Sequence, residues 1–427
     1  MSVCLGNLTG GEARETTRAE LCRKCYSCQD GISSDVTIDT VNKGEGKKNG
    51  AVKSSPFTWF VFPTNGCNLS CRYCYANNAP GIMTKEVMHQ TLLWLFNKQP
   101  HKKFKVHFFG GEPTTQWDML VDFVKIGNVM AIDNNCEVAW SMTTNGTLLT
   151  QDRILWIKDN FNPNAPFLLS IDGRPETHNL NRVYHNGGGS FEDIPVDLIL
   201  KTFPNLECRP TITANNSLNW IEDYKYLRNR GFKHIAIEPD HENIWTEEQY
   251  NNYERLLESL GKYYILSIRA GAPIKMKWID VVKEGLMRGV VPTGSMCGVG
   301  KNSGAIDHRG KLYACQRYAS YNEPDKYTIG DIWNGWDEIK LFETQALCRE
   351  HVFGVESLGY TCGTCMARQF CLKGCNASNI KHMGKRETAP PAHCELQRRE
   401  VKVGILVLAE LGMLALKGKA AAQKCSK

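Results

Sequence analysis

The sequence predicts an α/β fold, in which a partial (β/α)6 barrel is followed by a small cysteine-rich domain with short strands and by a C-terminal helix. Three features predict it. Strand-like and helix-like segments alternate between residues 56 and 290, cysteine, glycine and aromatic residues increase after residue 290, and an apolar segment lies near the C-terminus. Parallel strands of a barrel end at one face, where we expect the chemistry to lie.

The barrel is expected to begin at Phe57, where an apolar run predicts a buried strand. The next segment has a helical apolar stripe, and the same alternation then continues along the chain. The expected strands are 57–63, 104–110, 136–142, 166–172, 208–214 and 234–240. The expected helices between the first four strands are 84–98, 116–130 and 152–158. The alternation favours about six βα units around a parallel sheet.

Four segments are expected along the chain. Residues 1–55 form a polar, cysteine-containing extension, and Lys43–Pro56 has the composition of a linker. Residues 56–290 form the barrel, and residues 291–395 form a small domain held together by metal. Residues 396–427 form an apolar helix, roughly 396–416, and a basic tail.

Length and charge exclude several classes of protein. The chain has 427 residues, of which 42% are hydrophobic and 22% are charged, so wholesale disorder is excluded. The last 32 residues hold seven Lys or Arg and two Asp or Glu, and they supply +5 of the net charge of +6. The nearly neutral remainder argues against a protein that binds duplex nucleic acid.

The 18 cysteines are the most unusual feature of the composition. The N-terminus lacks the basic-then-apolar order of a signal peptide. The longest apolar stretch, Val403–Leu416, contains Glu410 and is too short for a membrane span. We therefore expect a cytoplasmic protein in which disulfides are rare, so that clustered cysteines indicate metal or catalytic sites.

Three cysteines directly follow the first expected strand. Cys67, Cys71 and Cys74 have the spacing C-x3-C-x2-C. Three thiolates on one loop can hold three irons of a cubane cluster and leave the fourth iron open to an outside ligand. Zinc is the alternative, although a structural zinc site also needs a fourth ligand nearby.

These cysteines resemble the cluster-binding motif of the radical SAM superfamily. Tyr73 is the aromatic residue of that motif, and FFGGEP (Phe108–Pro113) ends the second strand, where the family has a glycine-glycine-glutamate segment. The resemblance implies that the open iron binds the amino and carboxylate groups of S-adenosylmethionine. It also implies that reduction of the cluster cleaves this cofactor to a 5′-deoxyadenosyl radical, which abstracts a hydrogen atom from the substrate.

The same resemblance implies a set of contacts to S-adenosylmethionine. They are Gly110, Gly111, Glu112, Tyr73 through its backbone, Ser170, Asp172 and Arg182. The glycine-glycine-glutamate residues would face the methionine amino group, and Tyr73 would touch the adenine. Ser170 and Asp172 would contact the methionine carboxylate and the ribose, and Arg182 is a further candidate for the carboxylate.

A second group of seven cysteines lies after residue 290. It resembles the SPASM extension of radical SAM enzymes, which builds two auxiliary 4Fe–4S clusters. The resemblance assigns four of them to the distal cluster, namely Cys362, Cys365, Cys371 and Cys394. It assigns the other three to the proximal cluster, namely Cys297, Cys315 and Cys375. Structural zinc is the alternative for this region.

Seven cysteines cannot close two cubanes, which need eight ligands. The proximal cluster is therefore expected to have an open iron or to borrow a ligand, and Cys348 is a candidate donor. Three further cysteines, Cys22, Cys25 and Cys28, lie in the N-terminal extension with the spacing C-x2-C-x2-C. They predict either an additional zinc or iron–sulfur site or a mobile, thiol-rich arm.

The substrate is less well defined by the sequence. Segment 170–191 resembles the peptide- and protein-modifying branch of the family, which includes sulfatase maturases. In those maturases an aspartate follows the cysteine that matches Cys315, whereas this chain has Gln316. An amide cannot take up a substrate proton, so sulfatase maturation is disfavoured. Gln316 and Arg317 are candidates for the substrate site.

Together these features predict a radical SAM oxidoreductase with three 4Fe–4S clusters and S-adenosylmethionine. The expected substrate is a peptide or protein side chain, which would gain a cross-link, a thioether or an oxidised group. The expected reductant is a flavodoxin or ferredoxin. The alternatives are a dehydrogenase or mutase of a small molecule and a non-catalytic iron–sulfur or zinc scaffold.

Overall fold

The computed structural model describes most of the chain after the N-terminal extension. The described residues are 56–77, 80–288, 299–321, 324–349, 356–357, 360–371, 374–386 and 388–412. They all belong to one unit, which runs from Ser55 to Lys427.

Six parallel strands form the barrel. They are β1 (Phe57–Thr64), β2 (Lys103–Gly110), β3 (Glu137–Thr144), β4 (Phe167–Leu169), β5 (Glu207–Cys208) and β7 (His234–Ile235). Each pairs in parallel with the next along this series, so the chain advances one strand at a time around the sheet. The predicted partial (β/α)6 barrel is therefore confirmed.

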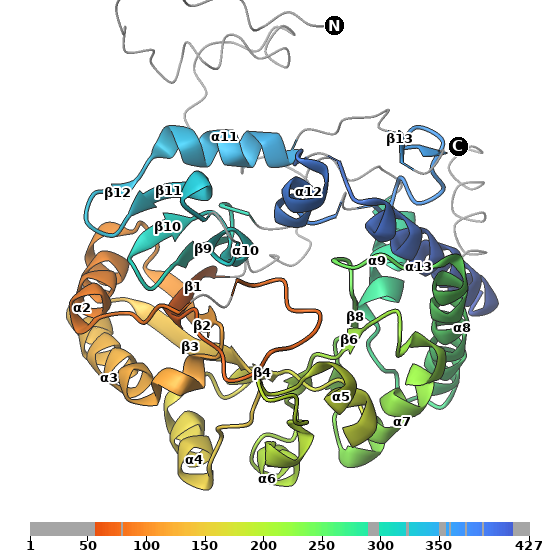
Figure 1. Ribbon diagram of the computed structural model, residues 1–427, viewed down its shortest axis with the longest axis horizontal. Helices are drawn as coiled ribbons and strands as arrows, with labels where there is room; N and C mark the ends of the chain where they lie inside the picture. The colour runs from red at the N-terminus through yellow and green to blue at the C-terminus, as the bar shows by residue number, and fades with distance from the viewer. Residues whose placement is uncertain are drawn as a thin grey trace, which may run out of the picture. The chain divides into compact units, whose positions relative to one another are not determined.

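Helices follow the strands and cover the outer face of the curved sheet (Figure 1). The helices up to residue 288 are α2 (Lys85–Leu93), α3 (Trp117–Asp133), α4 (Gln151–Asn160), α5 (Pro175–Asn181), α6 (Val196–Thr202), α7 (Trp220–Arg230), α8 (Glu247–Arg269) and α9 (Lys277–Arg288). Short turns of other helix types are η3 (Trp94–Lys98), η4 (Pro113–Gln116), η5 (Phe191–Asp193), η6 (Ser217–Asn219) and η7 (Pro324–Tyr327). The predicted helix over 84–98 is observed as α2 and the π-helical turn η3.

The cysteine-rich region continues the sheet of the barrel. Strand β9 (Ser303–Ile306) pairs in parallel with β1, and β10 (Lys311–Tyr313), β11 (Thr328–Asp331) and β12 (Gly335–Trp336) follow in antiparallel order. The result is one ten-stranded sheet with the order β12-β11-β10-β9-β1-β2-β3-β4-β5-β7. The compositional change near residue 290 therefore does not break the sheet.

The remaining elements are short or lie near the C-terminus. The small strand pairs are β6 (Thr211–Ile212) with β8 (Glu238–Pro239), and β13 (Glu356–Ser357) with β14 (Tyr360–Thr361). The helices are α10 (Gln316–Ala319), α11 (Glu338–Arg349), α12 (Asn376–Met383) and α13 (Pro391–Glu410). No helix among the described residues is long and apolar enough to cross a membrane.

Aromatic packing joins the two parts of the sheet. Trp59 on β1 is fully buried, and its ring lies edge-on to that of Trp94, with centroids 4.7 Å apart. The ring of Trp336 on β12 stacks on Trp59 at 5.8 Å. Such aromatic pairs contribute about 0.5–1.5 kcal/mol beyond the area that they bury. The start of β1 is thereby held firmly, and the loop that follows β1 emerges from a rigid strand.

Three expected strands are shorter than predicted. Those over 166–172, 208–214 and 234–240 contribute only two or three residues each to the main sheet, as β4, β5 and β7. Pro210 lacks a backbone N–H, and it separates β5 from β6. The C-terminal helix was also placed wrongly, because α13 begins at Pro391 instead of residue 396. Proline is favoured in the first helical turn.

Candidate functional site

The three-cysteine loop leaves the end of β1 and is bound to the segment after α5. The backbone N–H of Ser70 donates to the carbonyl of Val183 at 2.7 Å, and that of Arg72 donates to Asn181 at 2.9 Å. Cys67 and Cys71 are half-buried, and Cys74 is exposed. The Cys67 sulfur accepts a hydrogen bond from the backbone of Leu69 at 3.4 Å.

The glycine pair at the end of β2 packs directly against the start of this loop. The backbone N–H of Gly111 donates to Thr64, and that of Glu112 donates to Gly66 at 3.0 Å. A Cβ atom on Gly111 would lie only 2.1 Å from the Gly66 carbonyl oxygen. Gly110 has φ +122°, which side chains rarely adopt. Glycine is therefore required for the two loops to meet.

Glu112 is 1% exposed and is held by donors from two strand ends. Its Oε1 atom accepts from the backbone and hydroxyl of Thr114 and from the Thr144 hydroxyl. Its Oε2 atom accepts from the backbone of Asn145 at 2.7 Å. Burial raises the pKa of Glu112, and these hydrogen bonds partly oppose that effect. Among the described residues Oε2 accepts this one hydrogen bond, which leaves the oxygen room for another donor.

Thr144 and Asn145 belong to a TTNG segment that the sequence alone identifies only as a turn. The structure shows that this segment orients Glu112 and also reaches the cysteine loop. The Asn145 amide donates to Asn68 at 2.9 Å, and Asn68 donates to Thr147 at 2.8 Å. The position of TTNG at the end of the third strand was the available signal, since neighbouring parallel strands end side by side.

Asp172, Tyr73 and Arg182 form a second polar group beside the cysteine loop, in which Tyr73 is half-buried. The Tyr73 hydroxyl donates to Asp172 Oδ2 at 2.7 Å, and Arg182 Nε lies 3.1 Å from Asp172 Oδ1. Asp172 and Arg182 are both buried. This group fastens the middle of the cysteine loop to the segment after β4. Ser170, in that segment, is half-buried, and its backbone N–H donates to Thr144 at 3.0 Å.

The electrostatic surroundings of the thiols differ along the loop. Burial raises the pKa of Cys67 to about 12, and the nearby Glu112 carboxylate adds to this effect. Burial also raises the pKa of Cys71, but the Arg182 guanidinium beside it opposes the rise. Thiolates at such positions need a compensating positive charge, which iron would supply if these cysteines held a cluster.

The second group of cysteines is described in part. Cys315 immediately precedes α10, and its sulfur accepts from the backbone of Arg317 at 3.3 Å. Cys375 immediately precedes α12, and Cys394 lies on α13. The remaining described members, Cys362, Cys365 and Cys371, lie between β14 and α12. Cys297, Cys22, Cys25, Cys28 and the side chain of Cys348 lie outside the described part.

Arg398 brings two of these cysteines into one neighbourhood. Burial alone lowers the pKa of Arg398, but Cys365, Glu395 and Cys394 beside the guanidinium raise it above its ordinary value. Cys365 and Cys394 are far apart in the sequence and were assigned to the same cluster. Among the described residues, no three His, Cys, Asp or Glu side chains are arranged to hold a single metal ion.

The two substrate-site candidates lie on α10. Gln316 is half-buried, and its backbone carbonyl accepts from the Ser320 hydroxyl at 2.9 Å. The Arg317 guanidinium donates to Glu242 at 2.6 Å and lies 4.0 Å from the centre of the Tyr75 ring. Sequence reasoning missed Glu242 and Tyr75, because no local pattern links them to Arg317.

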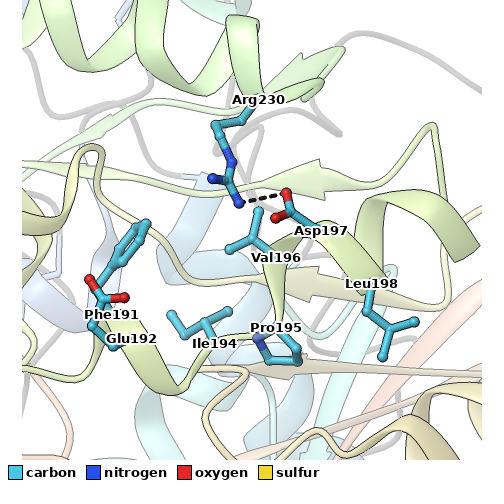
Figure 2. Close-up of a pocket in the computed structure, with 8 residues that line it drawn as sticks. All are labelled: Phe191, Glu192, Ile194, Pro195, Val196, Asp197, Leu198 and Arg230. Atoms are coloured by element: carbon cyan, nitrogen blue, oxygen red, sulfur yellow. Dashed lines mark hydrogen bonds and ion pairs between the residues drawn. The ribbon is translucent and has the colours of Figure 1, made fainter.

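A separate pocket lies at the edge of α6. Figure 2 shows its lining residues, which are Phe191, Glu192, Ile194, Pro195, Val196, Asp197, Leu198 and Arg230. Arg230 and Asp197 form an ion pair of 2.6 Å there. None of the lining residues is a cysteine or a predicted cofactor contact, so this pocket is not part of the candidate site.

A parallel barrel whose first strand ends in a three-cysteine loop, fastened to a glycine-glycine-glutamate segment, is the arrangement of a radical SAM enzyme. The chain belongs to the radical SAM superfamily, whose family model matches residues 61–194. It is similar to the cysteine-type anaerobic sulfatase-maturating enzyme of Clostridium perfringens, with 26% identity over 345 residues, 75% of this chain and 89% of the relative. An uncharacterized protein of Methanocaldococcus jannaschii is 30% identical over 47% of this chain and 70% of its own length.

Two solved structures share the fold. One is native anSMEcpe with bound AdoMet and a Cp18Cys peptide, with a TM-score of 0.68 and 21% identity over 84% of this chain and 99% of the other. The other is Streptococcus suis SuiB bound to its precursor peptide SuiA, with a TM-score of 0.50 and 13% identity over 87% and 85%. These likenesses confirm the predicted fold class.

The residues at the barrel mouth fit the cofactors that the superfamily uses. Three thiols on one loop are suitable ligands for three irons of a 4Fe–4S cluster. The Glu112 Oε2 atom has room for a donor such as an amino group. The Arg182 guanidinium lies beside Cys71 and supplies positive charge near the thiols.

Proposed function

We propose that this radical SAM enzyme modifies a peptide or protein side chain, giving a cross-link, a thioether or an oxidised group. The observation that carries the proposal is the fastened cysteine loop. The backbone of Glu112 binds Gly66 at the start of the loop, and Asp172, paired with Arg182, binds Tyr73 in its middle. Similarity to a sulfatase-maturating enzyme over 89% of that relative supports a peptide or protein as the substrate class.

Each candidate residue has a defined part in this proposal. Cys67, Cys71 and Cys74 would hold the cluster, and Gly110, Gly111, Glu112, Tyr73, Ser170, Asp172 and Arg182 would hold S-adenosylmethionine or the loop around it. When bound and reduced, the cluster and S-adenosylmethionine supply a 5′-deoxyadenosyl radical for hydrogen abstraction. The protein then has to orient the cofactor and exclude water from the site. Burial of Glu112 and Asp172 supports this, because both carboxylates keep fixed orientations.

The cysteine-rich region would hold two auxiliary 4Fe–4S clusters. The proposed distal ligands are Cys362, Cys365, Cys371 and Cys394, and the proposed proximal ligands are Cys297, Cys315 and Cys375. The effect of both Cys365 and Cys394 on the pKa of Arg398 supports the distal set. Such clusters supply sites for electron storage when bound. A flavodoxin- or ferredoxin-type protein is the proposed reductant.

The side chain at position 316 separates this proposal from sulfatase maturation. Gln316 is an amide and cannot act as a general base. We therefore propose a different modification from that of the sulfatase-maturating relative, and we assign no catalytic base to this chain.

Release of 5′-deoxyadenosine tests the proposal. The chain, reconstituted without oxygen, should bind about twelve irons, as three cubanes require. With S-adenosylmethionine and dithionite it should release 5′-deoxyadenosine, and Cys71→Ala should abolish the release. Cys136→Ala is the matched control, because Cys136 precedes β3 and is no proposed ligand. A scaffold without activity would bind iron but release no 5′-deoxyadenosine.

A further inference from the structure

A half-buried arginine connects the two groups of cysteines. Arg317 is in the first turn of α10, two residues after Cys315, and its backbone N–H donates to the Cys315 sulfur at 3.3 Å. Its guanidinium lies 4.0 Å from the centre of the Tyr75 ring, and Tyr75 directly follows Cys74 of the first loop. One residue thus contacts both the end of the first cysteine loop, through its side chain, and Cys315 of the second cysteine group, through its backbone.

Backbone contacts reinforce this connection. The N–H of Asn77 donates to the carbonyl of Ser320 at 2.8 Å, and the N–H of Ser320 donates to the carbonyl of Arg317. The first cysteine loop is therefore bound to α10 by its main chain as well as through Tyr75. A substitution at Arg317 would therefore alter contacts at both groups of cysteines.

Glu242 holds the guanidinium in place. Its carboxylate accepts from Arg317 at 2.6 Å, and from Lys381 and His382 at 2.9 Å each. Lys381 and His382 lie on α12, which begins directly after Cys375. The side chain of Glu242 is only 9% exposed, so these ion pairs are shielded from solvent more than surface pairs are. The carboxylate therefore ties the Cys315 and Cys375 segments to the loop after β8.

The charges of the side chains that meet at Glu242 do not sum to zero. Arg317 and Lys381 carry two positive charges against the single carboxylate of Glu242. Burial alone lowers the pKa of Arg317, but Cys375, Tyr75 and Glu242 raise it well above its ordinary value. Arg317 is thus linked to Cys315 through its backbone N–H, and its guanidinium is linked to the segment of Cys375 through Glu242 and Lys381 of α12.

We propose that Arg317 is a positioning residue that fixes the first cysteine loop against α10 and raises the reduction potential of the cluster held by Cys315 and Cys375. Nearby charge and hydrogen bonds to the sulfurs are among the factors that set the potential of an iron–sulfur cluster. A positive charge favours the reduced form, which carries one more electron. This inference rests on the proposed function, because it requires the auxiliary cluster to form.

Redox titration followed by electron paramagnetic resonance tests the inference. The background is the full chain with Cys67→Ala, Cys71→Ala and Cys74→Ala, which removes the signal of the first cluster. Arg317→Gln should lower the potential of one auxiliary cluster, so that its reduced-to-oxidised ratio at fixed poise falls about tenfold, equivalent to about 59 mV for one electron. Glu242→Gln should shift the same signal in the opposite direction, because it removes a negative charge.

Two further variants separate charge from folding. Arg317→Lys keeps the positive charge, so the reduction potential of the auxiliary cluster should stay close to that of the background chain. Arg309→Gln is the matched control, since Arg309 also pairs with carboxylates, Asp307 and Asp325, but has no cysteine beside it among the described residues. The reduction potential of the auxiliary cluster in Arg309→Gln should equal that of the background chain.

The outcomes distinguish this inference from the proposed function. Absence of auxiliary clusters in the background chain, seen as missing iron, overturns both. At full iron content, unchanged potentials in Arg317→Gln and Glu242→Gln, or shifts of the same sign in both, overturn this inference alone. Loss of iron in Arg317→Gln, together with no rise in the reduction potential of the auxiliary cluster in Glu242→Gln, also overturns this inference.

Discussion

At the scale of single residues, the site depends on carboxylates that are buried and fully oriented. Glu112 receives donors from η4 and from the end of β3, and Asp172 receives donors from the cysteine loop and from Thr211. A buried carboxylate with these partners cannot rotate freely, so it presents the same oxygen to any ligand. The orientation of the site is therefore fixed before a cofactor binds.

Glu112→Gln should weaken binding of S-adenosylmethionine. The amide replaces one oxygen by an NH₂ group, which would face a backbone or hydroxyl donor of Thr114, Thr144 or Asn145. A buried donor left without an acceptor costs about 1–3 kcal/mol, so affinity should fall about tenfold or more. Calorimetry on the reconstituted chain measures this. Glu137→Gln changes an exposed glutamate and should bind normally. Equal affinities would show that Glu112 does not shape the site.

His107 should make stability depend on pH. Its ring nitrogens lie 2.8 Å from Ser141 Oγ and Thr143 Oγ1, and burial lowers the pKa of His107 to about 3. The unfolded chain binds a proton near pH 6.5 that the folded chain does not bind until about pH 3, so this contribution to stability is lost as pH falls through that window.

His107→Gln removes this contribution to the pH dependence. Between pH 7 and pH 5 the unaltered chain should lose about 2 kcal/mol more unfolding free energy than the variant does. The other buried histidines titrate alike in both proteins and cancel. Anaerobic equilibrium unfolding in urea measures the difference. Parallel pH profiles of the two proteins would contradict the assignment of His107 as a neutral, buried side chain.

At the scale of elements, the C-terminal helix closes one side of the barrel wall. Figure 1 shows α13 beside α8. The fully buried Tyr253 on α8 donates its hydroxyl proton to Glu400 of α13 at 2.8 Å. Burial raises the pKa of Glu400, and the hydrogen bond from Tyr253 partly opposes that effect. The helix that carries Cys394 is thus fixed to the barrel through a partly buried polar contact.

Tyr253→Phe should destabilise this contact. Glu400 would lose its buried donor, at a cost of about 1–3 kcal/mol of unfolding free energy. Tyr263→Phe, on the same helix, is the control, because the Tyr263 hydroxyl has no hydrogen bond to the described residues. Unfolding in urea compares the two variants. An equal loss in both would mean that ring packing, and not the hydrogen bond, joins the helices.

The long and strongly patterned elements were the easiest to predict. β1, β2 and β3 and helices α2, α3 and α4 lie close to the expected positions, because their apolar patterns are continuous. The lengths of the later strands were overestimated, since proline and buried polar groups interrupt them. Helix α8 was not predicted, although Thr246 and Gln249 form a capping box at its start.

At the scale of the whole molecule, the cysteine-rich region shares a sheet with the barrel. Composition predicted a change near residue 290, but pairing of β9 with β1 depends on contacts that are remote in sequence. The same limit applies to the site. Motif spacing predicted the cysteines and the family resemblance predicted Glu112, whereas Thr144, Asn145, Glu242 and Tyr75 joined them only through the fold.

The central claim is that three cysteines leave one iron open for S-adenosylmethionine. Electron–nuclear double resonance on the reduced chain, with S-adenosylmethionine labelled with ¹⁵N at the amino group and ¹⁷O at the carboxylate, tests it most directly. We expect both labels to couple to the cluster and the coupling to be lost in Cys71→Ala. A cluster that forms fully but couples to neither label would contradict an iron left open for S-adenosylmethionine.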